Sequence, residues 1–415
     1  MNQALLYRIE QCMQEKNWNK SNLAKHSGIH LSDISRIFKH KQPLSLQNLD
    51  AITKSLGLDE AALYTDYIEE CFNENQHLDK RRTIQLLYKC VREGYEQHAH
   101  AILNSILEEK SKTIRNKNLM YIFSVAEMLF KAGKEKEAYP LYEIIIETMP
   151  NRFSEPLAIS YFRRFYIVSM TEEGQHALSY VLEQLAYMPI DVKMEAYFVI
   201  TAFYYRREKW REVLYYADRL ESMVNEGIYY GRALQYKSFA LRRLGGSLEE
   251  VLSLTDRYAQ INEFFTDIAS GNRLVALLDY EHLEYADEYL IWLEKREDSY
   301  IGLPRLLEAF VELKRIDDAE TLLNRFKHVI DEISVSEDSF KQQAYLRFRF
   351  ALSMYLCKSQ RFQEGMNELL EVAYSASKIG NMEMLKRCLW LFWTYRNHVT
   401  VEHEEKYKQL LHESL

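Results

Sequence analysis

The chain has 415 residues, of which only 13 are Gly and 6 are Pro, and its formal net charge is −8 at pH 7. Average usage of these two residues is about 7% and 5%, so the chain lacks the turn formers that a sandwich or barrel of many short strands requires. A hydrophobic content of 47% with 27% charged residues excludes a disordered chain. We therefore expect an all-α protein with about two to three domains.

The cysteine pattern and the apolar runs indicate the cellular compartment of the protein. Five cysteines are scattered along the chain and none forms a CxxC pair, so we expect reduced thiols and no disulfide framework or zinc site. Arg8, Glu10 and Glu15 interrupt any apolar run near the first residue, so we expect no secretion signal. Apolar stretches such as residues 197–205 fall short of the ~18 residues of a membrane helix. These features predict a soluble, cytoplasmic protein with no membrane partner and no cofactor.

Charge is distributed unevenly along the chain. Residues 1–66 hold eight Lys or Arg and seven acidic residues, whereas the remainder is strongly acidic. Between residues 16 and 41 six basic residues accompany a single acid, Asp33. A basic segment beside an acidic body favours a nucleic-acid-binding head, although a solvated basic face would have the same composition.

Apolar residues at helical spacing predict four helices in the first 66 residues, within 5–13, 19–28, 31–38 and 46–57. The second begins at Asn19, which we expect to be its N-cap, and ends at Gly28, which we expect in the left-handed conformation. Gly57 closes the fourth. The residues expected to be buried are Leu5, Leu6, Ile9, Met13, Ile34, Ile37, Phe38, Leu46, Leu49, Ile52 and Leu56.

The order of these residues resembles the Cro/CI-type helix-turn-helix domain. Leu23-Ala24 precedes Gly28, then come Ile34-Ser-Arg-Ile-Phe38 and a Leu-x-x-Ile-x-x-x-Leu-Gly-Leu segment that ends at Leu58. Ala24 is small where the two helices of the motif cross, and Gly28 permits the tight turn between them. The resemblance implies a DNA-binding domain over residues 1–66, with 31–38 as the recognition helix in the major groove. The alternative is a degenerate head kept for packing or dimerisation.

The same resemblance implies the contacts with DNA. Arg36 would read guanine O6 and N7, while Ser32 and Ser35 would contact bases or phosphate. Asp33 departs from an ideal anion-facing surface, so it would accept from cytosine N4 or simply cap the helix. One such head makes a small interface, so we expect a homodimer on a two-part double-stranded operator. The expected phosphate contacts are Lys20, Lys39, His40 and Lys41.

After a connector at residues 67–80, residues 81–415 repeat a helix, a short turn and a second helix that starts at a small anchor residue. Fourteen of the sixteen residues four and seven places after the anchors are apolar. The pattern resembles tetratricopeptide repeats, which implies a right-handed superhelix with a concave face. The longest gap between anchors contains residues 329–339, which we expect to be an extended turn. The anchors are Ala99, Ala138, Ala177, Val213, Val251, Ala286, Ala319 and Gly365.

No motif of an enzyme stands out. The sequence contains no GxSxG, Walker loop, HExxH or GxGxxG. The Asp317-Asp318 pair suits a solvated turn better than acid–base chemistry, and the histidines do not cluster at metal-ligand spacing. We therefore expect no enzymatic activity and no metal site.

A Cro/CI-type head followed by such repeats is similar in layout to the RRNPP regulators of Gram-positive bacteria and their phages, including the arbitrium receptors. The resemblance implies quorum sensing: the repeats bind a short re-imported signalling peptide in their concave groove, and the peptide changes dimer geometry and DNA binding. For each candidate contact, packing or a surface ion pair is the alternative role. The acidity of the array would suit a basic peptide. The candidates are Arg163, Tyr166, Tyr197, Tyr204, Arg206, Tyr236, Asn272, Arg273 and Arg347.

Two other classes of function remain open. The first is a peptide-regulated module that binds a response regulator or another protein without DNA, against which the Leu23–Phe38 pattern argues. The second is a scaffold that binds no small ligand.

Overall fold

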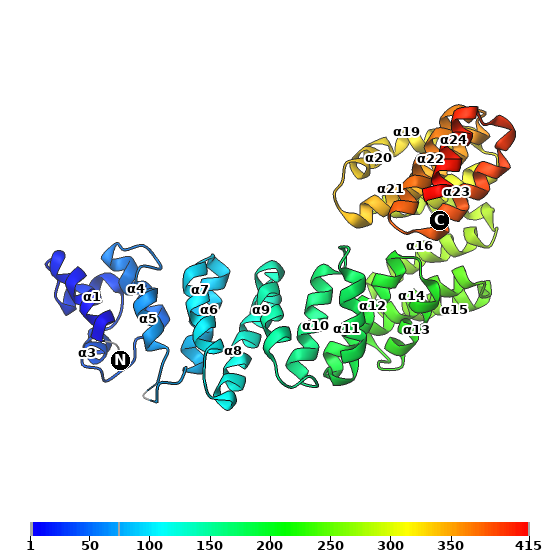
Figure 1. Cartoon of the computed structure of the whole chain (residues 1–415). Coiled ribbons are helices and arrows are strands. Elements are labelled where there is room, and N and C mark those ends of the chain that lie inside the picture. Colours follow the sequence, from blue (N-terminus) through cyan, green and yellow to red (C-terminus); the bar gives the residue numbers. More distant parts are fainter. Residues whose placement is uncertain (1–2, 74, 414–415) are drawn as a thin grey trace. The chain divides into compact units, whose positions relative to one another are not determined.

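The computed structural model describes residues 3–73 and 75–413 and is helical throughout this range (Figure 1). These residues form no strand, and their one isolated bridge joins Phe72 to Leu78. The expected all-α class is therefore confirmed. No helix in the described range is both long and apolar enough to cross a membrane.

The chain divides into two compact units, residues 1–189 (unit 1) and 190–415 (unit 2). The helices of unit 1 are α1 (Gln3–Glu15), α2 (Lys20–Ser27), α3 (Leu31–Phe38), α4 (Leu46–Leu56), α5 (Tyr64–Glu70), α6 (Lys80–Glu93), α7 (Glu96–Leu107), α8 (Lys112–Lys131), α9 (Glu135–Thr148), α10 (Glu155–Val168), α11 (Gly174–Gln184) and the 3-10 turn η1 (Leu185–Tyr187).

Unit 2 holds the remaining elements. They are α12 (Ile190–Arg206), α13 (Trp210–Glu221), α14 (Gly227–Leu244), α15 (Leu248–Ala259), α16 (Glu263–Asp279), η2 (Leu283–Tyr285), α17 (Ala286–Leu293), η3 (Ser299–Ile301), α18 (Leu303–Glu312), α19 (Ile316–Arg325), α20 (Lys327–Ser334), α21 (Ser339–Lys358), α22 (Phe362–Lys378), α23 (Met382–Thr394), η4 (Arg396–His398) and α24 (Val401–Glu413).

The first four helices begin and end for the reasons that the sequence indicates. The Asn19 side chain accepts from the backbone N–H of Asn22 and starts α2, while Gly28 ends this helix at a φ of 72°. Ser45 caps the start of α4 and Gly57 ends it at a φ of 70°. The eleven residues expected in the core are buried, apart from Phe38, which is half-buried.

The region after residue 80 consists of antiparallel helix pairs joined by a recurrent turn. In seven of the eight pairs one turn residue has a positive φ, and the next backbone N–H donates to the carbonyl five residues earlier at 2.8 to 3.0 Å. This Schellman turn satisfies carbonyls that the end of the first helix would otherwise leave without a donor. The pair α10–α11 uses a different turn. The left-handed residues are Gly94, Gly133, Glu208, Gly245, Glu281, Lys314 and Gln360.

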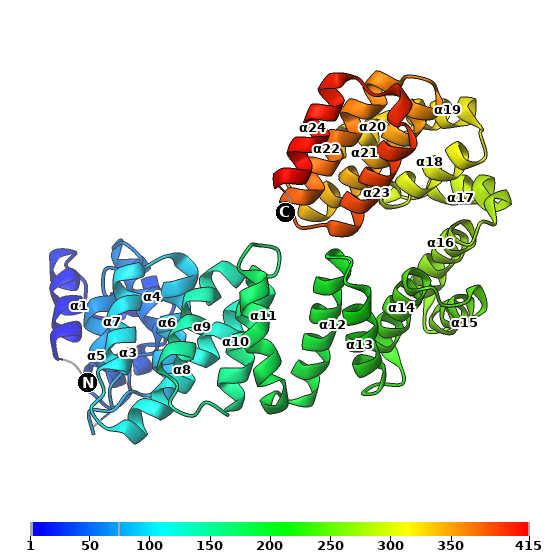
Figure 2. The ribbon, with the colours of Figure 1, turned by 45° about the vertical axis from the view of Figure 1, so that its right-hand side comes forward.

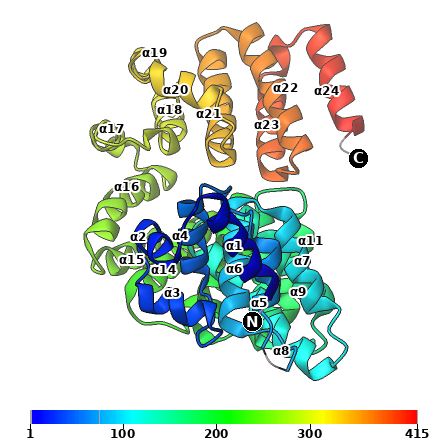
Figure 3. The same ribbon diagram turned by 90° about the vertical axis from the view of Figure 1, so that its left-hand side faces the viewer.

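The pairs stack on their neighbours within each unit. Figure 2 shows α6 to α11 stacked in unit 1, and Figure 3 shows α21, α22, α23 and α24 side by side in unit 2. First helices of successive pairs also touch one another, as α6 touches α8 and α12 touches α14. Since each pair buries its apolar stripe only against its neighbours, the stack behaves as a repeat-like array.

All eight anchor residues are buried. Thirteen of the sixteen positions at four and seven places beyond them are buried too, and the exceptions are half-buried. Two exceptions have a simple cause: α17 and α19 bury Tyr289 and Leu322, each one residue earlier than the pattern predicts. The third is polar Gln184 at the end of α11.

The stretch 329–339 corrects one expectation. We expected an extended turn there, but residues up to Ser334 belong to α20, whose Val329 and Ile333 are buried. These two residues are four apart, which is the spacing of one helix face, and the acidic residues around them obscured the pattern.

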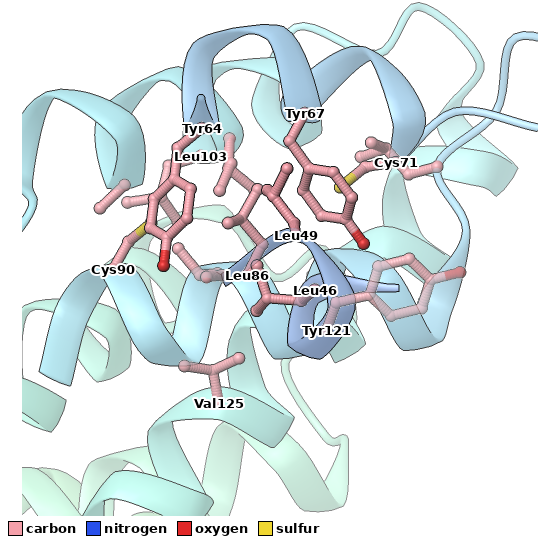
Figure 4. Close-up of a cluster of buried hydrophobic side chains, with 14 of the residues drawn as sticks. Leu46, Leu49, Tyr64, Tyr67, Cys71, Leu86, Cys90, Leu103, Tyr121 and Val125 are labelled. Atoms are coloured by element: carbon pink, nitrogen blue, oxygen red, sulfur yellow. The ribbon is translucent and has the colours of Figure 1, made fainter. Parts of the chain in front are cut away.

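The helix-turn-helix region and the first repeats share one hydrophobic core, which extends from Leu5 to Leu157. Figure 4 shows its centre, where Tyr64 and Tyr67 of α5 lie among residues of α4, α6, α7 and α8. Both rings are fully buried. The Tyr67 hydroxyl donates to the Leu44 carbonyl at 3.1 Å, so this polar tip is satisfied inside the core.

A charged network closes the same junction, which we call the head–repeat junction. The Lys89 ammonium of α6 donates to Asp50 of α4 at 2.7 Å and lies 2.7 Å from Glu60. The Tyr64 hydroxyl donates to the other oxygen of Asp50 at 2.9 Å, and the Tyr95 hydroxyl donates to Glu60 at 3.1 Å. The Lys89 and Asp50 side chains are only 15% and 29% exposed, so water screens this pair weakly, whereas Glu60 lies at the solvated edge of the network.

We predict that Gly365→Ala destabilises unit 2 by about 1–3 kcal/mol. An added Cβ would lie 2.6 Å from the Cys357 Sγ and 3.1 Å from the Cys357 backbone nitrogen, so α21 and α22 would have to separate. Thermal unfolding measures the effect, and Gln363→Ala, an exposed change in the same helix, is the control. An unchanged melting temperature for Gly365→Ala would contradict the close approach.

We also predict that Lys89→Met loosens the head–repeat junction. Asp50 and Glu60 would lose a charged hydrogen-bond donor, which costs about 1–2 kcal/mol at a partly buried site. Hydrogen–deuterium exchange should become faster in α4 and α5. Lys80→Met, at an exposed position of the same helix, should leave exchange unchanged. Equal protection in both variants would show that the network does not hold the head.

Candidate functional site

The helix-turn-helix geometry of α2 and α3 depends on the turn between them. After Gly28 the chain continues through buried Ile29 to His30, whose ring accepts from the backbone N–H of Ser32 and so caps α3. Ile34 and Ile37 are buried against the other helices. With this face fixed, the opposite face of α3 is left open to solvent.

The open face of α3 presents most of the residues expected to contact bases. Ser32 and Arg36 are exposed, and Asp33 and Ser35 are half-buried. The Arg36 guanidinium lies 3.8 Å from the Asp33 carboxylate, and 62% of the Arg36 side chain is exposed. Arg36 therefore extends from the surface with only a weak, solvated ion pair to hold it.

One of the two expected roles of Asp33 is wrong. His30, not Asp33, is the N-cap of α3, and the Ser32 hydroxyl lies 2.7 Å from the same His30 ring nitrogen. Asp33 instead points along the helix towards Arg36, one turn further on. A carboxylate there partly neutralises the cation that would read guanine.

The expected phosphate contacts lie at the two ends of the motif. Lys20 is the first residue of α2, and its ammonium lies 4.6 Å from the centroid of the Phe38 ring at the end of α3. Lys39, His40 and Lys41 are exposed and follow α3 in a turn where His40 has a φ of 55°. Lys20 is thus held close to the end of α3 by a cation–π contact.

Sequence reasoning missed Leu31, the first residue of α3, which is 44% exposed. An exposed leucine beside Ser32 is an apolar group of the kind that contacts the thymine methyl in a major groove. Its position beside Ser32 at the start of the recognition helix was the available signal, but only the polar residues of this helix were considered as base contacts.

The two peptide-contact candidates of unit 1 have different surroundings. Arg163 is buried, with its Nε 3.3 Å from Glu127 and its guanidinium 4.3 Å from the Phe130 ring centroid. These contacts make it a packing residue. Tyr166 is 39% exposed and packs edge-on against the same Phe130 ring, so part of its surface is accessible.

The tyrosines of unit 2 pack in two groups. Tyr197 and Tyr204 of α12 both contact Tyr216 of α13, with the Tyr204 ring stacked on it. They therefore fill the space within one helix pair. Tyr236 of α14 packs against Tyr205 of α12, between first helices of successive pairs.

Asn272 and Arg273 are neighbours on α16 with separate contacts. The Asn272 amide donates to the Tyr258 hydroxyl at 3.0 Å. Arg273 pairs with Asp256 at 2.8 Å and lines an open cavity of about 600 Å³ between α15 and α16. Asn272 is thus committed to packing, whereas Arg273 borders accessible space.

Arg206 and Arg347 each lie close to another arginine, Arg207 and Arg243 respectively. Arg347 of α21 forms an ion pair with Glu208 at 2.7 Å, although 139 positions separate them in the chain. Arg206 lies near Tyr236, and its buried Nε has no hydrogen-bond partner among the described residues. Arg243 and Arg387 were not among the candidates from the sequence. Both Arg347 and Arg387 lie close to Arg243. No sequence signal marks them, because each is one arginine among many.

In the described part of the chain, no three His, Cys, Asp or Glu side chains gather in a way that could hold a metal ion. The four cysteines at positions 71, 90, 357 and 388 are buried and unpaired. Burial raises the pKa of each of these thiols to about 12, so they remain protonated at neutral pH.

Comparison with known proteins bears on the head of the molecule. A search of curated proteins finds no match to the chain. Residues 8–66 match the family model of the Cro/C1-type HTH DNA-binding domain. The matched range contains α2, α3 and α4 and the exposed face of α3 described above. The N-terminal part of this chain is therefore a helix-turn-helix domain of the Cro/C1 type, which indicates a DNA-binding regulator.

Proposed function

We propose that this protein is a sequence-specific DNA-binding transcriptional regulator of the cytoplasm, whose repeat region binds a short signalling peptide and forms a homodimer. The observation that carries the proposal is the exposed Ser32–Arg36 face of α3 within a Cro/C1-type domain. In such domains the recognition helix enters the major groove and its first turns approach base edges. Arg36 would read guanine, and Lys20 with Lys39–Lys41 would contact phosphates.

The head–repeat junction supports a regulated function. Lys89 bonds to Asp50 of the head, and Tyr64 and Tyr67 pack into the core that the head shares with the first repeats. A head fixed in this way moves with the repeats to which it is joined. A ligand that shifts the first repeats would therefore shift the recognition helix of each subunit, and so the spacing of the two heads of a dimer.

Two exposed tryptophans support a protein–protein contact. Trp390 and Trp393 of α23 are 69% and 62% exposed. Tryptophan is enriched at protein interfaces and seldom left this open on a monomer. We assign the exposed ring of Trp393 to self-association, since Trp390 also borders a cavity of unit 2. If a response regulator or another protein were the partner instead, pull-down of that protein by the wild type would survive Arg36→Ala.

The first experiment is DNA binding by the purified protein to fragments of its own locus, at one fixed salt concentration. Lys20→Ala with Arg36→Ala should abolish specific binding, because the pair removes one phosphate contact and one base contact. Lys110→Ala, which removes an exposed charge from the repeats, is the matched control. Specific binding that survives the double change would refute the proposed interface.

The single variants separate the two kinds of contact. Arg36→Ala should cost about 1–3 kcal/mol for the best operator and weaken discrimination at one base pair. Lys20→Ala should weaken binding to all sequences alike and reduce the salt slope by about one. Titrations at several salt concentrations measure both effects. The assignment fails if the two variants lose affinity and specificity in the same way.

We expect Asp33→Asn to increase DNA affinity at low salt, since it removes a negative charge from the surface that faces the phosphates. It also releases Arg36 from its only ion pair on the helix. The gain should shrink as salt rises, because the Debye length shortens. A loss of affinity would instead indicate that Asp33 itself accepts from a base.

A further inference from the structure

Three arginines of unit 2, Arg243, Arg347 and Arg387, lie close together, and Arg206 is connected to them through two tyrosines. We call Arg206, Arg243, Arg347 and Arg387 the arginine cluster. They belong to α12, α14, α21 and α23. Burial lowers the pKa of Arg243, and Arg387 and Arg347 are close enough to lower it further, against the opposing effect of Asp279. Arg347 is in turn close to Tyr205, whose ring packs against Tyr236 beside Arg206.

The cluster is accessible although protein surrounds it. The side chains of Arg243, Arg347 and Arg387 are 46%, 34% and 40% exposed. Arg243 is open to water although the surrounding protein lowers its pKa, which places it on a concave part of the surface. A solute can therefore reach these guanidinium groups, and the surrounding protein strengthens their attraction for an anion.

The carboxylates of unit 2 balance this charge only in part. Glu208 pairs with Arg347 at 2.7 Å, and Glu308 pairs with Arg387 at 2.9 Å. Asp279 lies 3.6 Å from Arg243 but is shared with Arg242 and Arg305 at 3.1 and 2.7 Å. One carboxylate cannot occupy all five N–H donors of a guanidinium group. The arginine cluster therefore keeps N–H groups with which it can bind another anion.

No acidic side chain in the described part of the chain pairs with Arg206. Its buried Nε has no hydrogen-bond partner among the described residues, and burial lowers its pKa. The next residue, Arg207, is similarly affected, and burial together with Arg206 lowers its pKa to about 10. Two adjacent cations without a carboxylate are costly in the free protein, so an anionic ligand would relieve that cost.

A cavity adjoins the cluster at Arg387. Its volume is about 360 Å³, and it is lined by Phe350, Met354, Trp390 and Leu391 together with Lys386, Arg387 and Glu312. The Glu312 carboxylate pairs with Arg305 at 3.2 Å, so it is already neutralised. The Arg387 guanidinium lies 4.3 Å from the Phe350 ring centroid. Aromatic rings with two cations at the border suit an apolar side chain that is attached close to a carboxylate.

We propose that the arginine cluster binds the carboxylate groups of a short acidic peptide, with an apolar side chain of the peptide in the adjoining cavity. The inference rests on the proposed peptide-binding function and names the charge of its ligand. It reverses the expectation of a basic peptide, which followed from the acidity of the repeat array. The overall charge of the array does not describe the local charge that a ligand meets at the arginine cluster.

The test presents the full-length protein with two pools of randomised hexapeptides, one with free C-terminal carboxylates and one with amidated C-termini. Retained peptides are identified by mass spectrometry. We expect peptides that carry Asp or Glu to be enriched about tenfold or more over those that carry Lys or Arg. A tenfold enrichment corresponds to a binding free energy difference of about 1.4 kcal/mol. Enrichment in both pools would assign the bound carboxylate to side chains, and enrichment only in the free pool would assign it to the C-terminus.

The variant Arg206→Gln/Arg243→Gln should lose this enrichment. It should also fold, since Arg206 has no partner to lose and Asp279 keeps Arg242 and Arg305. We expect a melting temperature equal to or above that of the wild type. The control Arg325→Gln/Arg361→Gln removes the same charge from exposed ion pairs with Glu294 and Glu364 and should keep the enrichment.

The outcomes separate this inference from the function on which it rests. If the protein retains peptides but does not prefer acidic ones, or if Arg206→Gln/Arg243→Gln keeps the preference, the arginine cluster is not the site and peptide binding stands. If the protein binds its operator but retains no peptide from either pool, peptide binding and this inference both fall.

Discussion

The burial of Tyr64 and Tyr67 between the head and the first repeats is the constraint on which the rest of unit 1 depends. Each ring is fully buried, and the core around them continues from Leu5 to Leu157 without a break. A head on a flexible tether would read DNA whatever the repeats did. Because this head shares its core with the repeats, and Lys89 ties the two across the same interface, the position of α3 follows the position of the first repeat.

Contacts along the repeats are also made between neighbours. Seven of the eight helix pairs are closed by a Schellman turn, and each pair buries its apolar stripe against its neighbours. Four of these turns place Glu, Lys or Gln in the left-handed region, where glycine would cost less. One of these residues is Glu208, whose carboxylate accepts a hydrogen bond from Arg347 of the distant helix α21. The strained turn thus carries a side chain that a glycine could not supply.

Much of the fold could be predicted from particular residues. Asn19, Gly28, Ser45 and Gly57 mark helix ends by local hydrogen bonding and by φ, which depend on a few neighbouring residues. The anchors predicted the helix pairs for a similar reason, since a small residue is needed where two helices meet. The pattern failed at residues 329–339, where the two residues that are buried, Val329 and Ile333, stand among acidic residues that hide the helical spacing.

The residues of the candidate sites were harder to predict than the fold, and some were found while others were missed. Recognition-helix residues follow from the order of the motif, so Ser32 and Arg36 were found, but the exposure of Leu31 and the capping role of His30 were not. Among the candidates in the repeats, Arg163 contacts Glu127 and Asn272 donates to Tyr258, so both have partners within the protein. An arginine that packs on phenylalanine and an arginine that binds a ligand can have the same neighbours in the sequence. They differ in the side chains that the fold places around them.

The sequence by itself determined the helical class, the helix-turn-helix motif and the register of the repeats, because these depend on periodicity and on caps within a few residues. Only the tertiary structure decided that the head is joined to the first repeats through Lys89 and two buried tyrosines. It alone brought Arg243, Arg347 and Arg387 from three distant helices to one surface. Such contacts join residues tens to hundreds of positions apart, and no local spacing encodes them.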